Sequence, residues 1–323
     1  MARTEQDRGV ASTFLALSAW FFTAVAGLLM LTQAFSWNGN NRLASLQALT
    51  PYVIAGLIPV CIIALWLGRE RLAATGSVIG LSGLLLALPF AFPPSQPAPA
   101  EDAVGVRAAA VNLLFSNPSV DQVANDLLDR DLDVVVFIEY TPDHEQVLKN
   151  HSLVERFPYR LDYNDPKARG MALWSRYPIV NPHRRGATSF GVNVNIEGPD
   201  GELRVMGVHP PTPVWNFDEW LDALDLIGDR ALNNGPPTLI IGDLNASYWN
   251  PSFRELLDRG FVDAHLAVGN RLGRSWPNDE FGPPFTQIDH ALLGHGLVAT
   301  AIEDFDVAGS DHRGFVVSVV PAR

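Results

Sequence analysis

Three long apolar runs without a charged residue dominate the first part of the chain. They cover Thr13 to Phe35, Pro51 to Leu67 and Leu72 to Phe92. Each is close to the roughly 20 residues that a helix needs to cross about 30 Å of hydrocarbon. A buried helix of a soluble domain normally keeps a polar face, and these runs show none. The pattern therefore predicts three transmembrane helices.

Basic residues flank these runs and predict their orientation. Arg3 and Arg8 precede the first run, as they would in a signal peptide, but the run is longer than the apolar region of such a peptide and further runs follow it. We therefore expect an anchor. Arg69 and Arg71 lie in the short link between the second and third runs. By the positive-inside rule both basic segments are cytoplasmic, so we expect a multi-pass membrane protein whose later residues lie outside.

A proline-rich segment, FPPSQPAPAED, follows the third run. Its four prolines favour an extended, semi-rigid spacer. We therefore divide the chain into a membrane anchor at residues 1–92, a linker at 93–103 and a globular domain at 104–323.

The apolar pattern becomes short and mixed in this third part. A strand is expected near 104–113, apolar residues between Val120 and Leu128 recur at helical spacing, and the strand VVVFI ends before Glu139. Strand, helix and strand together have the length of a crossover unit. Later runs alternate apolar and polar residues, which is typical of half-buried antiparallel strands. We expect a four-layer α/β sandwich, with two packed mixed β-sheets flanked by helices and preceded by the three transmembrane helices.

The charge balance of this domain weighs against nucleic acids as partners. Between Val104 and Arg323, 30 Asp and Glu residues stand against 18 Lys and Arg, and only two of the latter are lysines. Binding of nucleic acids depends mainly on basic residues that displace phosphate counterions. The single cysteine, Cys61, lies within the second apolar run, so no disulfide can form within the chain.

Polar residues follow several of the predicted strands, where an α/β sheet builds its site. Each has an ordinary structural explanation when taken alone, such as a hydrogen bond at a sheet edge, a loop position or a cap. The segment GDLN is by itself a good turn, because Gly, Asp and Asn all favour turn geometry. These residues are Asn112, Glu139, His209, Asp243, Asn245, Asp289, Asp311 and His312.

Taken in order, these residues resemble the motifs of the endonuclease/exonuclease/phosphatase superfamily. The matching segments are VNLL, VFIE, GMALWSRYPI, GVH, GDLN, SWP followed by QIDH, and GSDH, and the resemblance covers residues 104–323. It implies a metal-dependent hydrolase of phosphate esters. Two departures concern the substrate: Gln287 stands where many members have Arg, and Val208-His209-Pro210 replaces a usual Thr-His-Leu.

The resemblance also implies which residues hold the metal ion. Glu139 is the principal ligand, with Asp311 and Asn112 close to it. Hard oxygen ligands favour Mg²⁺, Mn²⁺ or Ca²⁺ over zinc, which prefers more His or Cys. Arg169, just before the strand MALWS, is a further candidate for contacting phosphate, whereas His290 is not expected to be a ligand.

The remaining residues act on water and phosphate, again as the resemblance implies. Asp243 orients or deprotonates the attacking water, and Asn245 holds a phosphoryl oxygen; on an extended segment, residues two apart point to the same side. His312 binds the phosphate or stabilises the pentavalent state, and Asp289 orients its imidazole and favours its cationic form. His209 contacts the phosphate or acts as general acid.

These expectations combine into a membrane-anchored, extracytoplasmic phosphoester hydrolase of the cell envelope. Its expected substrate is a phospholipid headgroup or a lipid-linked (polyprenyl) phosphate, because a short spacer keeps the site close to the bilayer. Several spans followed by such an outer domain are similar to bacterial VanJ-type glycopeptide-resistance membrane proteins, so we expect the bacterial cell membrane as location. The alternatives are an anchored extracellular nuclease, which the acidic balance disfavours, and a non-catalytic scaffold. The oligomeric state stays open.

Overall fold

The computed structural model describes residues 2–183, 191–232, 235–268, 270–278 and 282–323. The chain forms two compact units. An N-terminal unit extends to Ala91 and includes Trp249–Pro251. A sandwich unit comprises Phe92–Tyr248 and Ser252–Arg323. The predicted site residues all belong to the sandwich unit.

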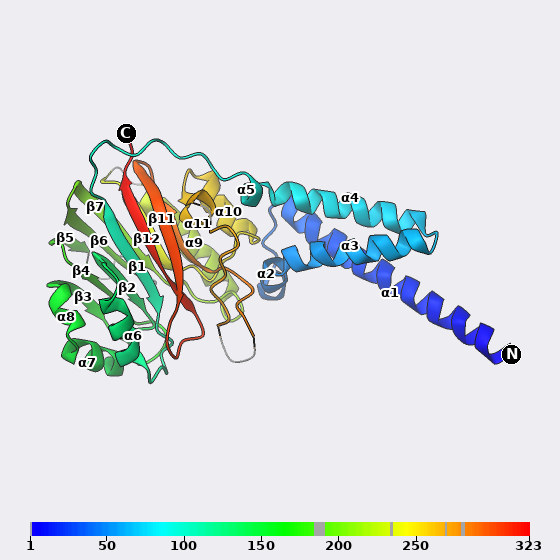
Figure 1. Ribbon diagram of the computed structural model, residues 1–323, viewed down its shortest axis with the longest axis horizontal. Helices are drawn as coiled ribbons and strands as arrows, with labels where there is room; N and C mark the ends of the chain where they lie inside the picture. The colour runs from blue at the N-terminus through cyan, green and yellow to red at the C-terminus, as the bar shows by residue number, and fades with distance from the viewer. Residues whose placement is uncertain (1, 184–190, 233–234, 269, 279–281) are drawn as a thin grey trace. The chain divides into compact units, whose positions relative to one another are not determined.

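Helices make up the N-terminal unit (Figure 1). The first apolar run forms most of one long helix. The next helix begins after Asn40, whose side chain accepts hydrogen bonds from the backbone amides of Arg42 and Leu43. The helices are α1 (Ala2–Ala34), α2 (Asn41–Ala48), α3 (Thr50–Trp66), α4 (Glu70–Leu86) and α5 (Leu88–Ala91).

The structure corrects the prediction of three transmembrane helices. Among the described residues, one helical segment, Ser12–Ala34, is long and apolar enough by itself to cross a membrane. The second run forms α3, which passes the same test only together with α2, from which it is bent by 61°. The third run forms α4, which has 17 residues, is about 25 Å long and begins with charged residues. The described chain therefore offers one span, or two if the bent pair is one span, and the multi-pass prediction is not supported.

Two six-stranded sheets form the sandwich unit. Their strand orders are β11-β12-β1-β2-β4-β3 and β5-β6-β7-β8-β10-β9. Both sheets are mixed, because β1 pairs with β2 and β7 with β8 in parallel, while the other neighbours are antiparallel. The strands are β1 (Val106–Asn112), β2 (Val134–Ile138), β3 (Tyr159–Tyr163), β4 (Met171–Ser175), β5 (Ile179–His183), β6 (Gly191–Gly198), β7 (Gly201–Val208), β8 (Thr238–Asp243), β9 (Val262–Asp263), β10 (Asp289–Leu293), β11 (Leu297–Asp306) and β12 (Arg313–Pro321).

The predicted crossover unit at the start of the sandwich is confirmed. The helix α6 (Val120–Leu128) connects β1 to β2, and the two strands run in parallel with Asn112 opposite Ile138. Because parallel strands end at the same edge of a sheet, Asn112 and the residue after Ile138, Glu139, come to one place.

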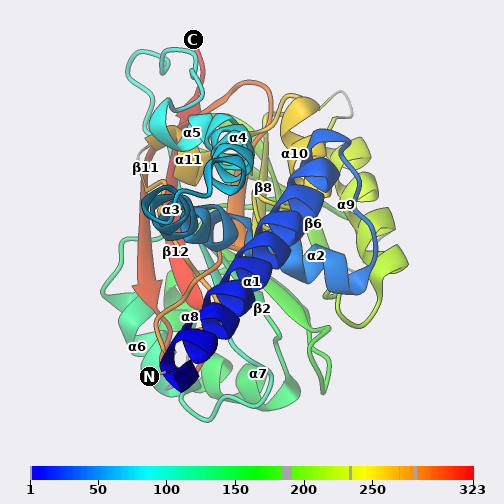
Figure 2. The same ribbon diagram turned by 90° about the vertical axis from the view of Figure 1, so that its right-hand side faces the viewer.

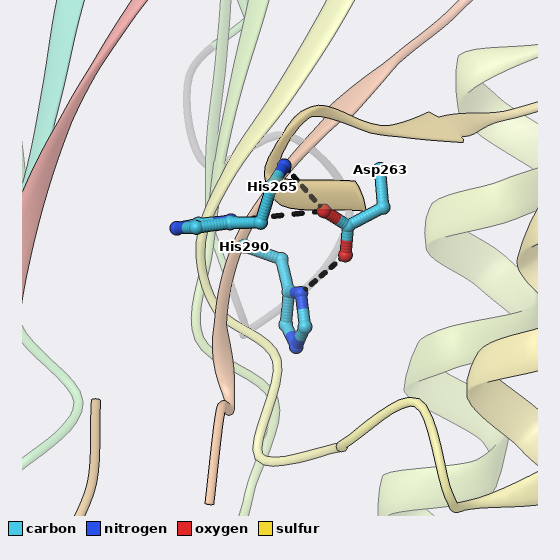
Figure 3. A group of neighbouring side chains, drawn as sticks. All are labelled: Asp263, His265 and His290. Atoms are coloured by element: carbon cyan, nitrogen blue, oxygen red, sulfur yellow. Dashed lines mark hydrogen bonds and ion pairs between the residues drawn. The ribbon is translucent and has the colours of Figure 1, made fainter. Parts of the chain in front are cut away.

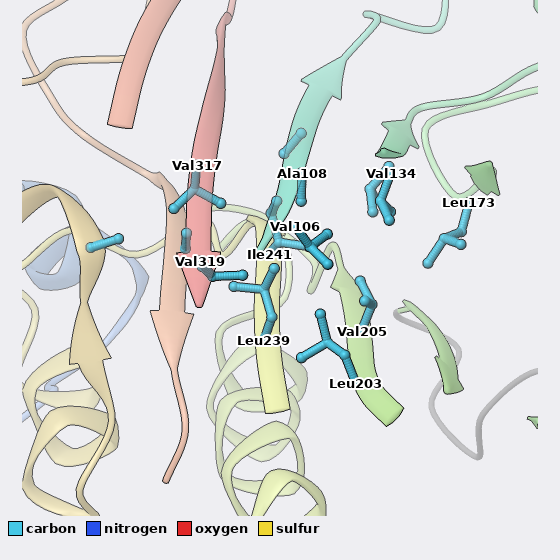
Figure 4. Packing of buried hydrophobic residues seen from close by; sticks show 14 of the residues in the cluster. Val106, Ala108, Val134, Leu173, Leu203, Val205, Leu239, Ile241, Val317 and Val319 are labelled. Atoms are coloured by element: carbon cyan, nitrogen blue, oxygen red, sulfur yellow. The ribbon is translucent and has the colours of Figure 1, made fainter. Parts of the chain in front are cut away.

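The main apolar core lies between the two sheets (Figure 4). Ala108 and Val134 of the first sheet pack in one cluster with Val205, Leu239 and Ile241 of the second, and all five are fully buried. Successive side chains of a strand point to opposite faces, so alternate residues of each strand supply this layer. Two mixed sheets packed in this way confirm the predicted α/β sandwich.

Helices cover the outer faces of the sandwich. On the first sheet, Val111, Val135 and Phe137 pack with Val123 and Leu127 of α6 in a second buried cluster. Figures 1 and 2 show α6, α7 (Pro142–Asn150) and α8 (Leu153–Arg156) on one side of the unit. They lie away from α9 (Phe217–Ala231) and α10 (Pro251–Asp258). A short helix, α11 (Ala264–Val268), follows β9.

The proline-rich linker is hydrogen-bonded within the sandwich unit. Gln96 Nε2 donates to the carbonyl of Ala299 at 3.2 Å, and Gln96 Oε1 accepts from the amide of the same residue at 2.8 Å. The amide of Ala100 donates to the carbonyl of Pro321. The segment is thus held against β11 and the end of β12.

Candidate active site

The ends of four strands bring together the polar residues that the sequence singles out. Asn112 is the last residue of β1, and Glu139 directly follows β2. Asp243 ends β8 and lies opposite Asp289, the first residue of the antiparallel strand β10. Asn112 joins the two sheets, because its Nδ2 donates to Asp243 Oδ2 at 3.2 Å.

Glu139 has an unusual backbone conformation. Its φ of 57° is in the left-handed region, which is costly for a residue other than glycine. Its Oε1 lies 3.5 Å from Asn112 Nδ2, and its Oε2 accepts a hydrogen bond from the amide of Phe115 at 2.9 Å. The half-buried carboxylate is therefore oriented by neighbours on both of its oxygens.

The GDLN segment is a tight turn. Gly242 has a φ of 145°, and a Cβ there would lie 2.3 Å from the carbonyl oxygen of Val208, so glycine is needed. Asp243 Oδ1 accepts from the amide of Asn245 at 2.8 Å, and Asn245 Nδ2 donates to the carbonyl of Pro210 at 3.0 Å. The predicted extended segment is wrong here: the strand ends at Asp243, and Asn245 has a left-handed φ of 48°. The side-chain hydrogen bond replaces the extended conformation by a turn.

Asp289 and His312 form a buried pair. Asp289 Oδ2 accepts from His312 Nδ1 at 2.9 Å, and both side chains are less than one-tenth exposed. Burial alone would lower the pKa of His312, but Asp289 and Asp243 outweigh it and raise this pKa to about 10. Burial would raise the pKa of Asp289, but His312 lowers it. The pair is therefore an imidazolium and a carboxylate at neutral pH.

Asp243 lies between two imidazoles. Its Oδ2 is 3.6 Å from His209 Nε2 and 3.8 Å from His312 Nε2. Burial, together with the neighbouring carboxylate of Asp289, raises the pKa of Asp243 to about 7. Burial also lowers the pKa of His209, so this imidazole is neutral at that pH. A carboxylate with a pKa near 7 can accept a proton from an attacking water at physiological pH.

Of the three predicted metal ligands, two contact each other and the third contacts Trp276. Asn112 contacts both Glu139 and Asp243, as described above. Asp311, one residue before His312, is half-buried, and its Oδ2 accepts from Trp276 Nε1 at 3.2 Å. A compact group whose ligand atoms all lie within 4.8 Å of one another consists of Asp243, Asp289 and His312.

The donor set fits a divalent cation. Four carboxylates gather at these strand ends. Among the predicted residues of this cluster, His312 is the one cation, and His209 is neutral. Excess negative charge and oxygen donors together suit Mg²⁺, Mn²⁺ or Ca²⁺. The carboxylates are Glu139, Asp243, Asp289 and Asp311.

Arg169 makes no hydrogen bond or ion pair with this cluster in the part of the chain that the structure describes. It is exposed in the turn before β4 and forms no hydrogen bond or ion pair within the described ranges. Its neighbour Ala168 nevertheless accepts a hydrogen bond from His209 through its backbone carbonyl. The turn that carries Arg169 therefore lies beside the site, while the contribution of its guanidinium stays a prediction.

Three further side chains support the site and are not assigned a role by the sequence. Ser275 Oγ accepts from the amide of Asp289 at 3.2 Å. Ser310 Oγ donates to the carbonyl of Asn112 at 2.7 Å and accepts from the amide of His312 at 3.1 Å. Trp276 holds Asp311. Ser275 and Trp276 belong to the SWP segment and Ser310 to GSDH, so their position in the motifs is the signal for them.

A second buried group lies outside this cluster (Figure 3). It contains Asp263 at the end of β9, His265 in α11 and His290 in β10. Figure 3 shows the carboxylate of Asp263 between the other two residues. Asp263 Oδ2 lies 2.7 Å from His290 Nδ1, and Asp263 Oδ1 lies 3.6 Å from His265 Nδ1. Sequence reasoning does not single out Asp263 or His265.

An α/β sandwich whose strand ends hold carboxylates, an amide and a charged His–Asp pair defines a class of phosphoester hydrolases. The model of the Endonuclease/Exonuclease/phosphatase family matches residues 109–312 of this chain. The chain belongs to this family, and it is a hydrolase of the phosphatase and phosphodiesterase type. Members of the family typically depend on a divalent metal ion. The comparison with curated proteins gave no match.

Solved structures share the fold of the sandwich unit at low sequence identity. An endonuclease/exonuclease/phosphatase family protein from Bacteroides thetaiotaomicron is 14% identical, with 69% of this chain and 100% of that chain covered and a TM-score of 0.56. The 3′ phosphatase NExo from Neisseria, bound to a product DNA hairpin, is 17% identical, with 66% and 98% covered and a TM-score of 0.52. D. rerio TDP2, complexed with a single-strand DNA product, is 14% identical, with 67% and 99% covered and a TM-score of 0.56.

Proposed function

We propose that this hydrolase is anchored to a membrane and cleaves a phosphate ester in a lipid, either a phospholipid headgroup or a lipid-linked (polyprenyl) phosphate. The observation that carries the proposal is the apolar helix Ser12–Ala34, of whose most apolar window only 22% is buried. Large apolar side chains on it, such as Phe14 and Phe21, are about 70% exposed. Soluble proteins rarely expose such a continuous apolar surface, whereas a bilayer covers it.

Exposed aromatic residues close in sequence to residues that contact the site support a lipid substrate. Phe115, whose amide binds Glu139, is 46% exposed. Trp215, five residues after the Pro210 carbonyl that binds Asn245, is 86% exposed. Aromatic side chains at the border between apolar and wet regions suit contact with lipid. An anchor also raises the effective concentration of the site toward lipids.

The geometry of the cluster supports the following roles for its residues. Asp243 takes the proton of the attacking water, and Asn245 holds a phosphoryl oxygen next to it. The imidazolium of His312 stabilises the negative charge that develops on the phosphate, and the neutral imidazole of His209 contacts the phosphate. Glu139, with Asn112 and Asp311, would hold a divalent cation such as Mg²⁺, Mn²⁺ or Ca²⁺, which would supply neutralisation of the charge on the phosphate.

The side of the membrane follows from the basic residues. Arg3 and Arg8 precede the span and favour a cytoplasmic N-terminus. A single span at Ser12–Ala34 then puts the sandwich unit outside the cytoplasm. A reporter that is active only in the cytoplasm, fused after Arg323, is expected to stay inactive; an active fusion contradicts this placement.

The second candidate is an anchored nuclease. It is favoured by the two solved structures with bound DNA products, which at 14% and 17% identity share the fold alone. The excess of 30 acidic over 18 basic residues between Val104 and Arg323 opposes it.

Substrate profiling separates the two candidates. The full chain in detergent micelles is supplied with Mg²⁺ and assayed for release of phosphate or headgroup from a short-chain phospholipid and a polyprenyl phosphate, and for cleavage of DNA and RNA. We expect turnover of a lipid substrate that is lost in Asp243→Asn and Glu139→Gln. Rapid cleavage of DNA without turnover of either lipid contradicts the proposal and supports the nuclease.

A further inference from the structure

We propose that Asp263, His265 and His290 form a second metal site, for a divalent transition-metal ion such as Zn²⁺, separate from the phosphoester site (Figure 3). All three side chains are at most 3% exposed. One ligand atom from each residue lies within 4.8 Å of the other two. A carboxylate and two imidazoles form a donor set that zinc prefers.

Hydrogen bonds define which ring nitrogen of each histidine carries the proton. His265 Nε2 lies 3.1 Å from Asp304 Oδ1. His290 Nε2 lies 3.0 Å from the carbonyl oxygen of Ala246 and 3.3 Å from that of Gln287. Carboxylate and carbonyl oxygens only accept hydrogen bonds, so Nε2 is the donor in both rings. Metal-binding histidines are oriented in the same way, with the second nitrogen donating to a carboxylate or a carbonyl.

The other nitrogen, Nδ1, faces the carboxylate of Asp263 in both rings. His265 Nδ1 is buried and has no hydrogen-bond partner, and it lies 3.6 Å from Asp263 Oδ1. His290 Nδ1 lies 2.7 Å from Asp263 Oδ2. Without a metal ion, His290 Nδ1 donates to this carboxylate, because a carboxylate oxygen only accepts. A metal ion bound at Nδ1 of both rings would replace the protons held there.

The distances favour a metal ion over a shared proton for His265. A separation of 3.6 Å is longer than an ordinary hydrogen bond of about 2.7 to 3.2 Å. Tetrahedral zinc with bonds of about 2.1 Å holds neighbouring ligand atoms about 3.4 Å apart. The pair of Asp263 and His290, at 2.7 Å, has to widen by a little over half an ångström.

Neighbouring residues orient one of the ligands. Asp304, which orients His265, accepts a further hydrogen bond from Asn270 Nδ2 at 2.6 Å. Two imidazole ligands suit zinc and its neighbours in the first transition row rather than Mg²⁺ or Ca²⁺, which prefer oxygen. The two metal sites of the protein therefore differ in their ligands and select different ions.

The second site is distinct from the first but connected with it. His290 follows Asp289 in β10, and adjacent residues of a strand point to opposite faces of the sheet. His290 also binds the carbonyl of Ala246, the residue after Asn245. A metal ion at His290 would therefore hold β9, α11 and β10 together and stabilise the turn that positions Asn245.

Metal binding to the full chain tests the proposal. The protein in detergent micelles is freed of metal with a chelator, dialysed, supplied with excess Mg²⁺ and titrated with Zn²⁺ by calorimetry. We expect about one Zn²⁺ per chain and a higher unfolding temperature when it is bound. Co²⁺ in its place should give the visible absorption of a tetrahedral site with nitrogen ligands.

Substitutions locate the ion. Asp263→Asn and His290→Gln should remove zinc binding and the Co²⁺ spectrum, and Asp304→Asn should weaken zinc binding about 10- to 100-fold. Glu139→Gln, in the phosphoester site, is the matched control and should bind zinc as the wild type does. Wild-type protein that binds no Zn²⁺ in the presence of Mg²⁺ overturns the proposal, as does zinc that is lost in Glu139→Gln and kept in Asp263→Asn.

Discussion

The charge of His312 depends on Asp289, and the substitution Asp289→Asn tests how much catalysis depends on that charge. Asparagine keeps the size of the side chain and still accepts a hydrogen bond from His312 Nδ1, but it removes the negative charge 2.9 Å away. The imidazolium is then left in a buried position with less compensation, so the neutral ring is favoured.

The size of the effect follows from the pKa of His312. Its rise from 6.5 to about 10 corresponds to roughly 5 kcal/mol in favour of the charged ring, shared mainly between Asp289 and Asp243. Asp289 acts both through its charge and through its hydrogen bond, so we assign most of this rise to it and expect the pKa of His312 in Asp289→Asn to return toward 6.5. About one ring in 30 is then charged at pH 8, which predicts a loss of about 30-fold in kcat/KM at that pH. The loss should be smaller at pH 6, because His312 of the variant is protonated again as the pH falls toward its ordinary pKa.

The assay is hydrolysis of bis(p-nitrophenyl) phosphate by the full chain with Mg²⁺, measured as the ratio of variant to wild type between pH 6 and pH 8. Asp229→Asn is the matched control, since Asp229 is exposed and pairs with Arg259, and neither residue belongs to the site. A loss below threefold at pH 8, or one that is the same at both pH values, refutes the reasoning.

Three further predictions concern single groups of the site. Asp243→Asn should abolish hydrolysis yet raise the free energy of unfolding by about 1 to 3 kcal/mol at pH 8 in the presence of chelator, because a carboxyl whose pKa rises from 3.8 to about 7 destabilises the folded state when it is ionised. This gain in stability should shrink toward pH 5. A variant that unfolds at a lower urea concentration than the wild type at pH 8 contradicts the prediction. Gly242→Ala should lower the free energy of unfolding by about 2 kcal/mol or more, because its Cβ would lie 2.3 Å from the carbonyl oxygen of Val208. The control Gly260→Ala, also at positive φ but with open space around it, should lower it by about 1 kcal/mol. Equal losses of stability in urea denaturation argue against the contact with Val208. Glu139→Gln should raise the Mg²⁺ concentration for half-maximal hydrolysis about 10-fold or more, and chelator should abolish wild-type hydrolysis; full activity in chelator excludes the proposed role of the metal.

The sandwich could be predicted from the sequence because its strands carry their own pattern. The buried run from Val134 to Ile138 and the helical spacing between Val120 and Leu128 are local features, and each forms the expected element. The apolar runs of the N-terminal unit form helices, as their pattern predicts, but they do not form three spans. Their ends depend on residues such as Asn40 and Glu70, which cap or start helices at positions that hydropathy alone does not reveal.

The site could be predicted as a set of residues but not as a geometry. The order of the motifs points to Asp243 and Asn245, but the turn between them results from a side-chain hydrogen bond that an alternating pattern does not show. Ser310 and Ser275 bind the backbone of Asn112 and Asp289, so their place in the motifs points to them but their hydrogen bonds appear only in the folded chain. The group around Asp263 depends on three elements that meet only in the folded chain.

The central claim is that the ends of β1, β2, β8 and β10 form one metal-dependent phosphoester site. A crystal structure of the protein with Mg²⁺ and inorganic phosphate tests it most directly. We expect Mg²⁺ bound to a carboxylate oxygen of Glu139, and phosphate within hydrogen-bonding distance of His312 and Asn245. Mg²⁺ away from Glu139, together with phosphate that contacts neither His312 nor Asn245, would contradict the account.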